Sequence, residues 1–301
     1  STHCISSAAS DVYKRQGVAL FTPFNDWGQV DYTSLSQLVN FLIQNQSQAL
    51  IVNGTTGESS TLTKDEKEKI LKTVVDLADS KVKVIANVGT NNTAQSIENA
   101  KAAQALGADG LLLITPYYNK TNQRGLIKHY ESILEEVDLP AILYDVPGRT
   151  GMRIELDTLE ELSHHPQIIG LKDATGDLDF FKQAKERVQD GFSFYSGNDG
   201  NIQSYYQLGG HGVISVLANV LPSDFQQVFD QPEGDYQALF DLVEALNVDV
   251  NPIPIKALAH HLNLAQNKLR LPLVELEAKE EEELILSLIH ISEPTRQAEI
   301  S

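Results

Sequence analysis

The sequence alternates between short apolar runs and longer segments in which apolar residues recur with helical spacing. The apolar runs are rich in β-branched and aliphatic residues, as strands buried on both faces of a parallel sheet are. They occupy residues 17–22, 49–54, 83–89, 110–115, 141–146, 168–173, 192–197 and 212–217. Eight strand–helix units in a row predict an α/β protein built as a (β/α)8 TIM barrel over residues 17–231.

The segment 63–78 illustrates the helical half of the repeat. Thr63 stands at the N-cap position and Glu66 follows three residues later, which is the pattern of a capping box. Ile70, Val74 and Leu77 then fall on one face of the helix. An open doubly wound sheet is the alternative fold. It would normally carry a glycine-rich nucleotide-binding fingerprint after its first strand, and PFNDWGQ is no such fingerprint.

Three further helical patterns follow the eighth unit, at 233–249, 251–264 and 273–286. We expect a C-terminal helical region over residues 232–286, joined to the barrel at QPEG (231–234), that packs on the barrel or forms an oligomer contact. Residues 1–16 and 287–301 break the pattern and resemble translated read-through of sequencing adapters. We therefore expect both ends to be non-native flanks and exclude them from the fold.

Composition excludes several classes of partner. The formal net charge of −18 argues against binding nucleic acid or an acidic lipid surface, because both need a basic face. No apolar run approaches the ~20 residues that span a bilayer. The single cysteine, Cys4, cannot form an intramolecular disulfide and fits a reducing cytoplasm.

Barrel enzymes place their active sites at the carboxyl ends of the strands. Lys172 lies there, inside the apolar run IIGLKD. If Ile169 and Leu171 face the helices, Gly170 and Lys172 face the barrel interior, and the glycine leaves room for the lysine stem. A desolvated lysine has a lowered pKa and can form a Schiff base with a carbonyl substrate. An ion pair with Asp173 or Asp145 would explain a buried lysine equally well.

Other polar residues follow the same strand ends. Thr55 and Thr56 lie in the glycine turn GTTGE, whose hydroxyl and N–H groups could cradle a carboxylate. Tyr144 could pass a proton to or from a substrate oxygen, or it could be an ordinary core tyrosine. Arg149 follows a Pro-Gly turn and could bind a carboxylate in two-pronged fashion, or it could be an ordinary loop arginine.

A metal site finds little support in the sequence. Two histidine pairs, 164–165 and 260–261, are present, but neither has the spacing of metal ligands, so surface or capping roles are expected. The segment GGHG (209–212) precedes the eighth strand, and we interpret it as a tight turn that uses glycine freedom.

Five motifs in a fixed order carry a resemblance to a known family. GTTGE, TPYYNK, YDVPGRTG, GLKDATG and GGHGVISV closely resemble the 4-hydroxy-tetrahydrodipicolinate synthase (dihydrodipicolinate synthase) family, within the pyruvate-dependent class I aldolases, over residues 17–286. The resemblance implies condensation of pyruvate with L-aspartate 4-semialdehyde through a lysine Schiff base. This is the first committed step of the diaminopimelate and lysine pathway, and it requires no metal or organic cofactor.

The resemblance also assigns roles to individual residues. Lys172 would form the Schiff base with pyruvate, while Thr55, Tyr144 and Tyr118 would form a proton-relay triad. In the family the third member of the triad, which Tyr118 matches, reaches in from the neighbouring subunit, and this implies a homodimer or homotetramer. The remaining matches are substrate contacts: Arg149 for the semialdehyde carboxylate, Thr56 for the pyruvate carboxylate, and Gly197 and Ile214 for the backbone lining of the pocket.

Two departures from the family pattern stand out. The usual YNVP is YDVP here, so Asp145 adds a possible negative charge near the site. Lysine-sensitive members carry a histidine and a glutamate in an effector pocket at the dimer interface, and the matching positions here look like Lys67 and Gln95, with Lys64 nearby. Two ammonium groups without a carboxylate should repel lysine, so we predict weak or absent lysine inhibition.

Two other functions would fit part of the same set of residues. Another pyruvate-dependent aldolase, such as N-acetylneuraminate lyase, would share the lysine, the tyrosine and the glycine–threonine turn. Arg149 and the tyrosine pair of TPYYNK favour the synthase, because they suit a short substrate that carries a carboxylate. A non-catalytic barrel used as a sensor or scaffold would not need the complete set of Lys172, Tyr144, Thr55 and Arg149.

Overall fold

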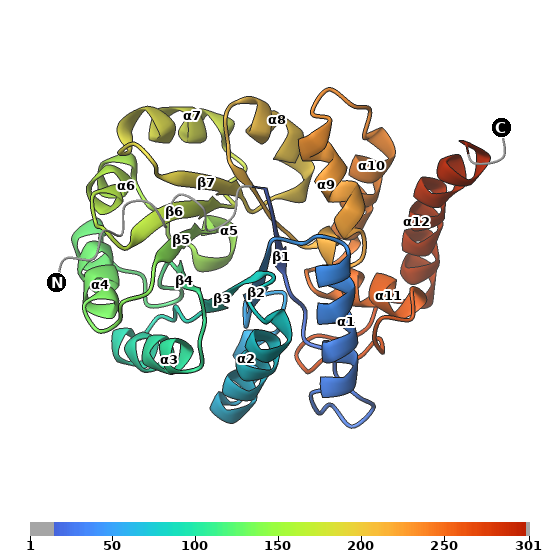
Figure 1. Cartoon of the computed structure of the whole chain (residues 1–301), viewed down its shortest axis with the longest axis horizontal. Helices are drawn as coiled ribbons and strands as arrows, with labels where there is room; N and C mark the ends of the chain where they lie inside the picture. Colours follow the sequence, from blue (N-terminus) through green and yellow to red (C-terminus); the bar gives the residue numbers. More distant parts are fainter. Residues whose placement is uncertain (1–14, 299–301) are drawn as a thin grey trace.

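A computed structural model, which describes residues 15–298, confirms the predicted barrel. Its eight strands are parallel, each pairs with the next, and β8 returns to pair with β1, so the open doubly wound sheet is wrong. The strands are β1 Gln16–Ala19, β2 Ala49–Val52, β3 Lys83–Asn87, β4 Gly110–Ile114, β5 Ala141–Asp145, β6 Ile168–Asp173, β7 Ser193–Ser196 and β8 Gly212–Ser215. Figure 1 shows them as a central ring.

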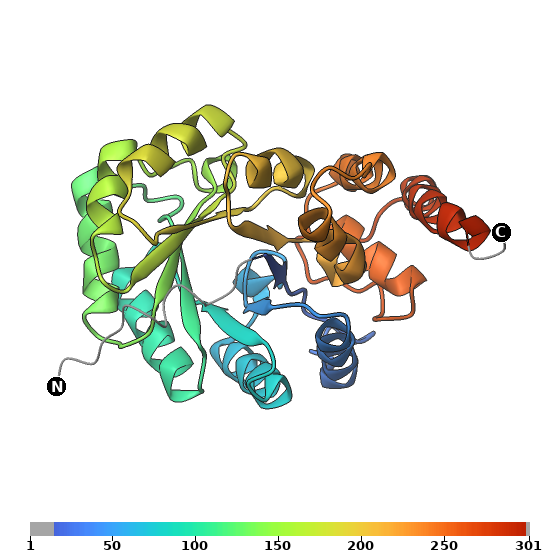
Figure 2. The same cartoon turned by 45° about the horizontal axis from the view of Figure 1, so that its top comes forward.

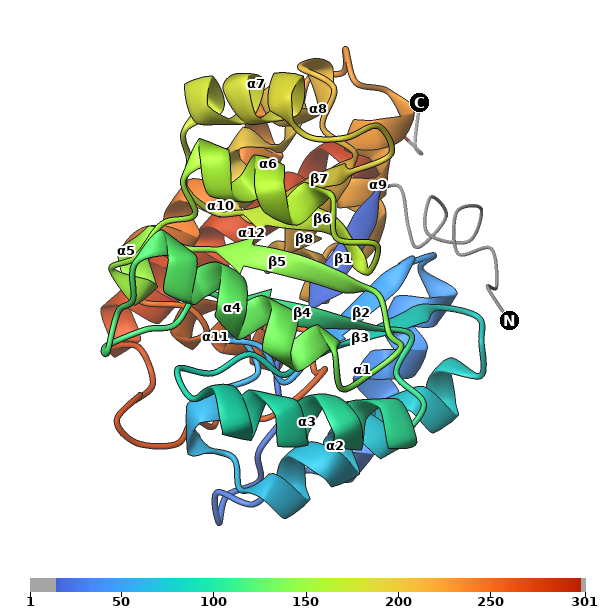
Figure 3. The same cartoon turned by 90° about the vertical axis from the view of Figure 1, so that its left-hand side faces the viewer.

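The helices surround this ring, as Figures 1 and 3 show from two sides. The α-helices of the barrel are α1 Tyr32–Gln44, α2 Lys64–Ala78, α3 Thr93–Ala105, α4 Gln123–Leu134, α5 Pro147–Thr150, α6 Leu156–Ser163, α7 Leu178–Arg187, α8 Ile202–Gln207 and α9 Pro222–Asp230. The predicted capping box of α2 is confirmed. The Glu66 backbone N–H donates to Thr63 Oγ1 at 3.2 Å, and the Thr63 N–H donates to Glu66 Oε2 at 2.9 Å.

Apolar side chains form an interior layer within the barrel and an outer layer between strands and helices. The pairing of β5 with β6 shifts by one residue, because Ala141 is opposite Ile168 but Ile142 is opposite Gly170. The extra residue, Ile169, packs in the interior layer, while Leu171 packs against the helices. The prediction that Ile169 faces the helices is therefore wrong, since a bulge resets the alternation of a strand.

Gly170 serves the strand pairing rather than the lysine stem. A Cβ atom at this position would lie 2.5 Å from the Ser193 carbonyl oxygen, so the glycine lets β6 approach β7 closely. At the start of β8 the predicted glycine turn is confirmed, with Gly209 at a φ of +90° and Gly212 beginning the strand.

The C-terminal helices lie together at one side of the barrel (Figures 1 and 2). They are α10 Gln237–Ala245, α11 Ile253–His261 and α12 Ala278–Ala298. The 3-10 turns among the described residues are η3 Ser59–Thr61, η4 Asp199–Asn201, η5 Leu217–Asn219 and η6 Leu246–Val248. The last helix was expected from residue 273. It begins five residues later, because residues 273–277 form a loop from which Leu273 and Leu276 pack against the apolar core.

The proposed division of the chain into barrel, helical region and flanks stays a prediction. Residues 1–14, including Cys4, and residues 299–301 lie outside the described part of the chain. Gln16 is part of β1, where its Nε2 donates to the Pro222 carbonyl at 2.7 Å, and Leu288 is buried in α12. No helix within residues 15–298 is both long enough and apolar enough to cross a membrane.

Candidate active site

Lys172 lies inside the barrel at the carboxyl end of β6, as predicted. Lys172 is only 6% exposed, and its Nζ lies 4.2 Å from the centre of the Tyr144 ring. Burial lowers the pKa of Lys172 to about 8, while Asp199 raises it and Arg149 lowers it further. Because the charged ammonium loses its hydration, a substantial share of the amine is neutral near physiological pH. Lys172 therefore has the character of a nucleophile.

The ion-pair interpretation of Lys172 is wrong for both suggested partners. Asp145 Oδ2 accepts from the Ile154 N–H at 3.3 Å, and Asp173 Oδ1 accepts from the Thr175 N–H at 2.9 Å. Both carboxylates therefore point to the helix side of the sheet, opposite to their neighbours Tyr144 and Lys172. Burial raises the pKa of Asp145 to about 7, with Asp173 adding to the shift. Asp145 does not contribute to the lowered pKa of Lys172.

Tyr144 and Thr55 adjoin the lysine. Tyr144 is opposite Lys172 in the strand register, and its ring packs in the interior layer. Burial raises the pKa of Tyr144, whereas Arg149 and a hydrogen bond with the Thr55 side chain lower it. Thr55 lies in the turn 54–58, which is closed by the Glu58 N–H donating to the Thr55 carbonyl at 3.0 Å. The amine, the phenol and the hydroxyl thus form one contiguous group.

Thr56 and Arg149 meet through a residue that sequence reasoning missed. Asn251 Nδ2 donates to Thr56 Oγ1 at 3.0 Å, and Arg149 donates to the Asn251 backbone carbonyl at 3.2 Å. Thr56 is buried and Arg149 is exposed at the rim, where it can meet an incoming carboxylate. Asn251, the polar first residue of the segment NPIP (251–254), was the available signal, but its partners are too distant in sequence to be foreseen.

Gly197 and Ile214 also line the barrel beside the lysine. A Cβ atom on Gly197 would lie 3.0 Å from Lys172 Cε and 2.8 Å from Ala174 Cβ, so this glycine, and not Gly170, makes room for the lysine stem. Ile214 is buried in the interior layer on β8. Sequence reasoning did not assign a role to Asp199, which follows β7.

Asp199 holds the backbone after β8 in place. Its Oδ2 accepts from the N–H groups of Val216 at 3.0 Å and Leu217 at 2.9 Å. Its Oδ1 is buried and lacks a hydrogen-bond partner within the described residues. Burial raises the pKa of Asp199, and the nearby Lys172 lowers it. The carboxylate therefore acts on the lysine through its charge.

Tyr118 is not brought to this cluster within the chain. It lies in the loop between β4 and α4, is 92% exposed, and has a left-handed backbone with a φ of +66°. Such a backbone is unfavourable for a residue with a side chain. Its expected role in a neighbouring subunit stays a prediction.

The predicted effector positions lie outside the barrel between α2 and α3. A cavity of about 50 Å³ is lined by Lys64, Lys67 and also Glu68, which approaches Lys64 to 3.9 Å. The cavity thus holds one carboxylate beside the two ammonium groups, and the effector role of these positions stays a prediction. Gln95 is outside the lining, and its Nε2 donates to Asn99, which lines the cavity. Burial lowers the pKa of Lys67.

Within residues 15–298, no three or more acidic, histidine or cysteine side chains cluster in a way that could hold a metal ion. His164 and His260 each use Nδ1 on a backbone carbonyl near the end of a helix, at 2.8 and 3.2 Å. The His164 contact caps the end of α6, whereas Ala265 lies in the loop after α11; both histidines are exposed, which fits the expected surface or capping roles.

Comparison with known proteins assigns the chain to a family. The sequence model of the Dihydrodipicolinate synthetase family matches residues 13–290. The chain belongs to this family. The solved dihydrodipicolinate synthase from Aquifex aeolicus is 37% identical, with 93% of this chain and 98% of that chain covered and a TM-score of 0.89.

Two further solved relatives are similar over the same length. The enzyme from Acinetobacter baumannii, described as chloride inhibited and complexed with pyruvate, is 39% identical, with 91% and 97% of the two chains covered and a TM-score of 0.88. The enzyme from Cyanidioschyzon merolae, solved with lysine bound, is 37% identical, with 92% and 98% covered and a TM-score of 0.89. The predicted family, fold and enzyme class, a lyase of lysine biosynthesis, are confirmed.

Proposed function

We propose that this family member condenses pyruvate with L-aspartate 4-semialdehyde to give 4-hydroxy-tetrahydrodipicolinate, and that Lys172 is the amine that captures pyruvate. The observation that carries the proposal is the burial of Lys172 against Tyr144 inside the barrel, with its pKa lowered to about 8. A relative that is 39% identical was solved in complex with pyruvate, which supports a keto acid as the first substrate.

The chemistry follows from the neutral amine. Lys172 Nζ attacks the keto carbon of pyruvate, a carbon–nitrogen bond forms, and water leaves to give an iminium. The iminium withdraws electrons, so a methyl proton can leave and an enamine results. The enamine carbon then attacks the aldehyde carbon of the second substrate, so that a carbon–carbon bond forms, the aldehyde oxygen takes up a proton and the iminium is restored. The amino group of the second substrate next attacks the iminium carbon, closes the ring and displaces Lys172 Nζ, which regenerates the free amine. The iminium itself serves as the electron sink in this scheme.

Tyr144 and Thr55 are the proposed proton carriers. Their hydroxyl groups are hydrogen-bonded to one another beside the amine, where the departing water and the keto oxygen exchange protons. Tyr118 would complete this relay from a neighbouring subunit, for which its exposed position is suited. This role requires a homodimer or homotetramer. Separately, we propose that the protein is located in the cytoplasm.

Substrate carboxylates are assigned to two places. Thr56 and the backbone groups near Gly197 and Ile214 would hold the pyruvate carboxylate deep in the barrel. Arg149 would bind the semialdehyde carboxylate at the exposed rim, where Asn251 fixes its guanidinium. The positive charge of Arg149 also helps to keep the lysine neutral.

Incubation with pyruvate and borohydride tests the proposal. The reduced adduct should appear on Lys172 by mass spectrometry and be absent from a Lys172→Ala variant. An unmodified wild-type protein would refute the Schiff-base mechanism. Aspartate semialdehyde and N-acetylneuraminate, supplied separately in a coupled assay, then distinguish the synthase from the related lyase.

A further inference from the structure

A second buried lysine lies outside the proposed reaction. Lys256 on α11 is only 1% exposed, and its Nζ contacts the carboxylate of Glu58, donates to the Lys268 carbonyl at 2.8 Å and lies 4.1 Å from the centre of the Phe24 ring. Burial lowers the pKa of Lys256 to about 8, and Glu58 acts in the opposite direction. Buried ion pairs are weak sources of stability, because desolvation offsets the attraction between the charges. A role in positioning explains this pair better.

Glu58 belongs to the same turn as Thr55 and Thr56. Its backbone is left-handed, with a φ of +52°, which is unfavourable for a residue with a Cβ atom. Both carboxylate oxygens are held from the C-terminal part of the chain, Oε1 by Lys256 and Oε2 by the Arg270 backbone N–H at 3.0 Å. The Glu58 N–H in turn donates to the Thr55 carbonyl. The carboxylate contacts therefore fix the conformation of the turn that carries both threonines.

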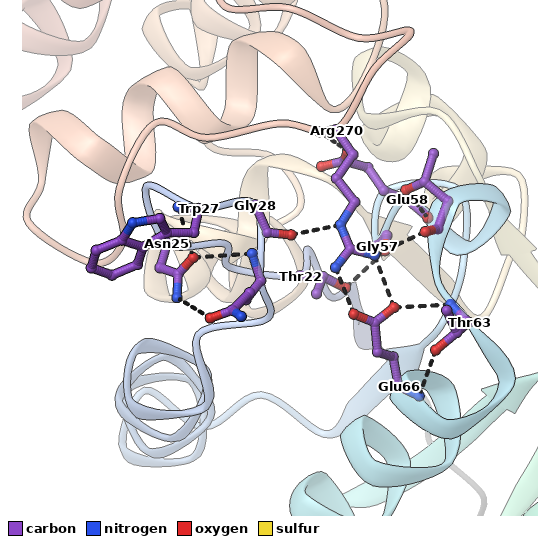
Figure 4. Close-up of polar contacts among 11 residues, drawn as sticks. Thr22, Asn25, Trp27, Gly28, Gly57, Glu58, Thr63, Glu66 and Arg270 are labelled. Carbon is purple, nitrogen blue, oxygen red and sulfur yellow. Dashed lines mark hydrogen bonds and ion pairs between the residues drawn. The ribbon is translucent and has the colours of Figure 1, made fainter.

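Arg270 binds the segments on either side of this turn, as Figure 4 shows. Its guanidinium forms an ion pair with Glu66 at 2.6 Å and donates to the carbonyl oxygens of Gly28 and Thr61, each at 2.8 Å. It also lies 4.5 Å from the centre of the Phe24 ring, which Lys256 contacts as well. One C-terminal segment thus contacts the loop after β1, the turn after β2 and the start of α2.

We infer that Lys256, through its buried ion pair with Glu58, is a positioning residue that sets the placement of the Thr55 and Thr56 hydroxyl groups for catalysis. The inference rests on the proposed roles of those threonines. Asn251 acts in parallel, because it holds Thr56 Oγ1 from the same segment. Lys256 itself does not touch the reacting atoms.

Three variants and one control test this inference: Lys256→Met, Glu58→Gln, the double variant, and Glu275→Gln. The control removes an exposed pair of the same segment, formed with Lys268 at 3.3 Å. Each single change leaves a buried group without its partner and should lower both the melting temperature and kcat. The double variant removes both charges and should regain the melting temperature. Its kcat and its rate of borohydride-trapped adduct formation should stay about 10-fold to 100-fold low, because a misplaced group costs rate.

The pH midpoint of adduct formation should be unchanged in the double variant, since the surroundings of Lys172 are intact. The control should keep wild-type kcat, and if it does not, the effect is not specific to the buried pair and the inference is wrong. A double variant with wild-type kcat would also overturn it. So would a double variant as destabilised as the single ones, because its lost activity would then reflect the fold. A wild-type protein without any adduct refutes the Schiff-base function instead.

Discussion

The pKa of Lys172 leads to a quantitative prediction about pH. A shift from 10.5 to about 8 corresponds to about 3 kcal/mol in favour of the neutral amine. At pH 7 this raises the neutral fraction from about 0.03% to about 10%, a gain of about 300-fold. The rate of pyruvate adduct formation, trapped with borohydride at subsaturating pyruvate, should therefore rise from pH 6, reach half its maximum near pH 8 and level off above.

Two variants should move this midpoint in opposite directions. Asp199→Asn removes a negative charge that favours the ammonium form, so the midpoint should fall. Arg149→Gln removes a positive charge that disfavours it, so the midpoint should rise. Both are followed by mass spectrometry of the reduced adduct across the same pH series. A midpoint near 10.5 in the wild type, or the same direction of change in both variants, would refute the electrostatic reasoning.

Three further outcomes are expected. Gly197→Ala should slow adduct formation about 10-fold to 100-fold, because the added methyl group would displace Lys172; an unchanged rate would contradict the proposed contact. The folded-state pKa of Asp145 is raised from 3.8 to about 7. Burial of its charged form therefore lowers the free energy of unfolding, by an amount that grows as the pH rises between these two values and reaches at most about 4 kcal/mol above pH 7. Asp145→Asn should therefore raise the melting temperature more at pH 8 than at pH 5, and equal gains would disprove this. Lysine should inhibit weakly or not at all, since Lys64 and Lys67 outnumber the one carboxylate, Glu68, in the cavity, whereas saturable inhibition at low millimolar lysine in a kinetic assay would overturn that expectation.

Sequence patterns predicted the features that depend on neighbours in the chain. The strands, the capped start of α2 and the inward direction of Lys172 all follow from local periodicity and spacing. The shift between β5 and β6 could not be foreseen, because a single extra residue such as Ile169 leaves the apolar pattern intact. The predicted start of the last helix was wrong for a similar reason, since the apolar spacing of α12 continues back into the loop that precedes Ala278.

Long-range polar contacts are the second kind of feature that the sequence did not predict. Asn251 and Thr56 are 195 residues apart, and each is an ordinary loop residue by its own sequence context. Asp199 likewise acts on Lys172 through space, from a neighbouring strand end. Motif resemblance identified the groups proposed to touch substrate, whereas the residues that hold those groups emerged only from the folded chain.

The C-terminal contacts with the turn after β2 have a consequence for biosynthesis. A growing chain that ends after β8 already contains every strand of the barrel, together with Lys172, Tyr144 and Thr55. Asn251, Lys256 and Arg270 are made last, so until then the turn keeps local contacts, such as Thr22 Oγ1 donating to the Gly57 carbonyl at 2.7 Å, but the Glu58 carboxylate lacks its partners. Closure of the barrel and onset of full activity would thus be separate events during translation, and a nascent barrel would react more slowly with keto acids until its final segment docks.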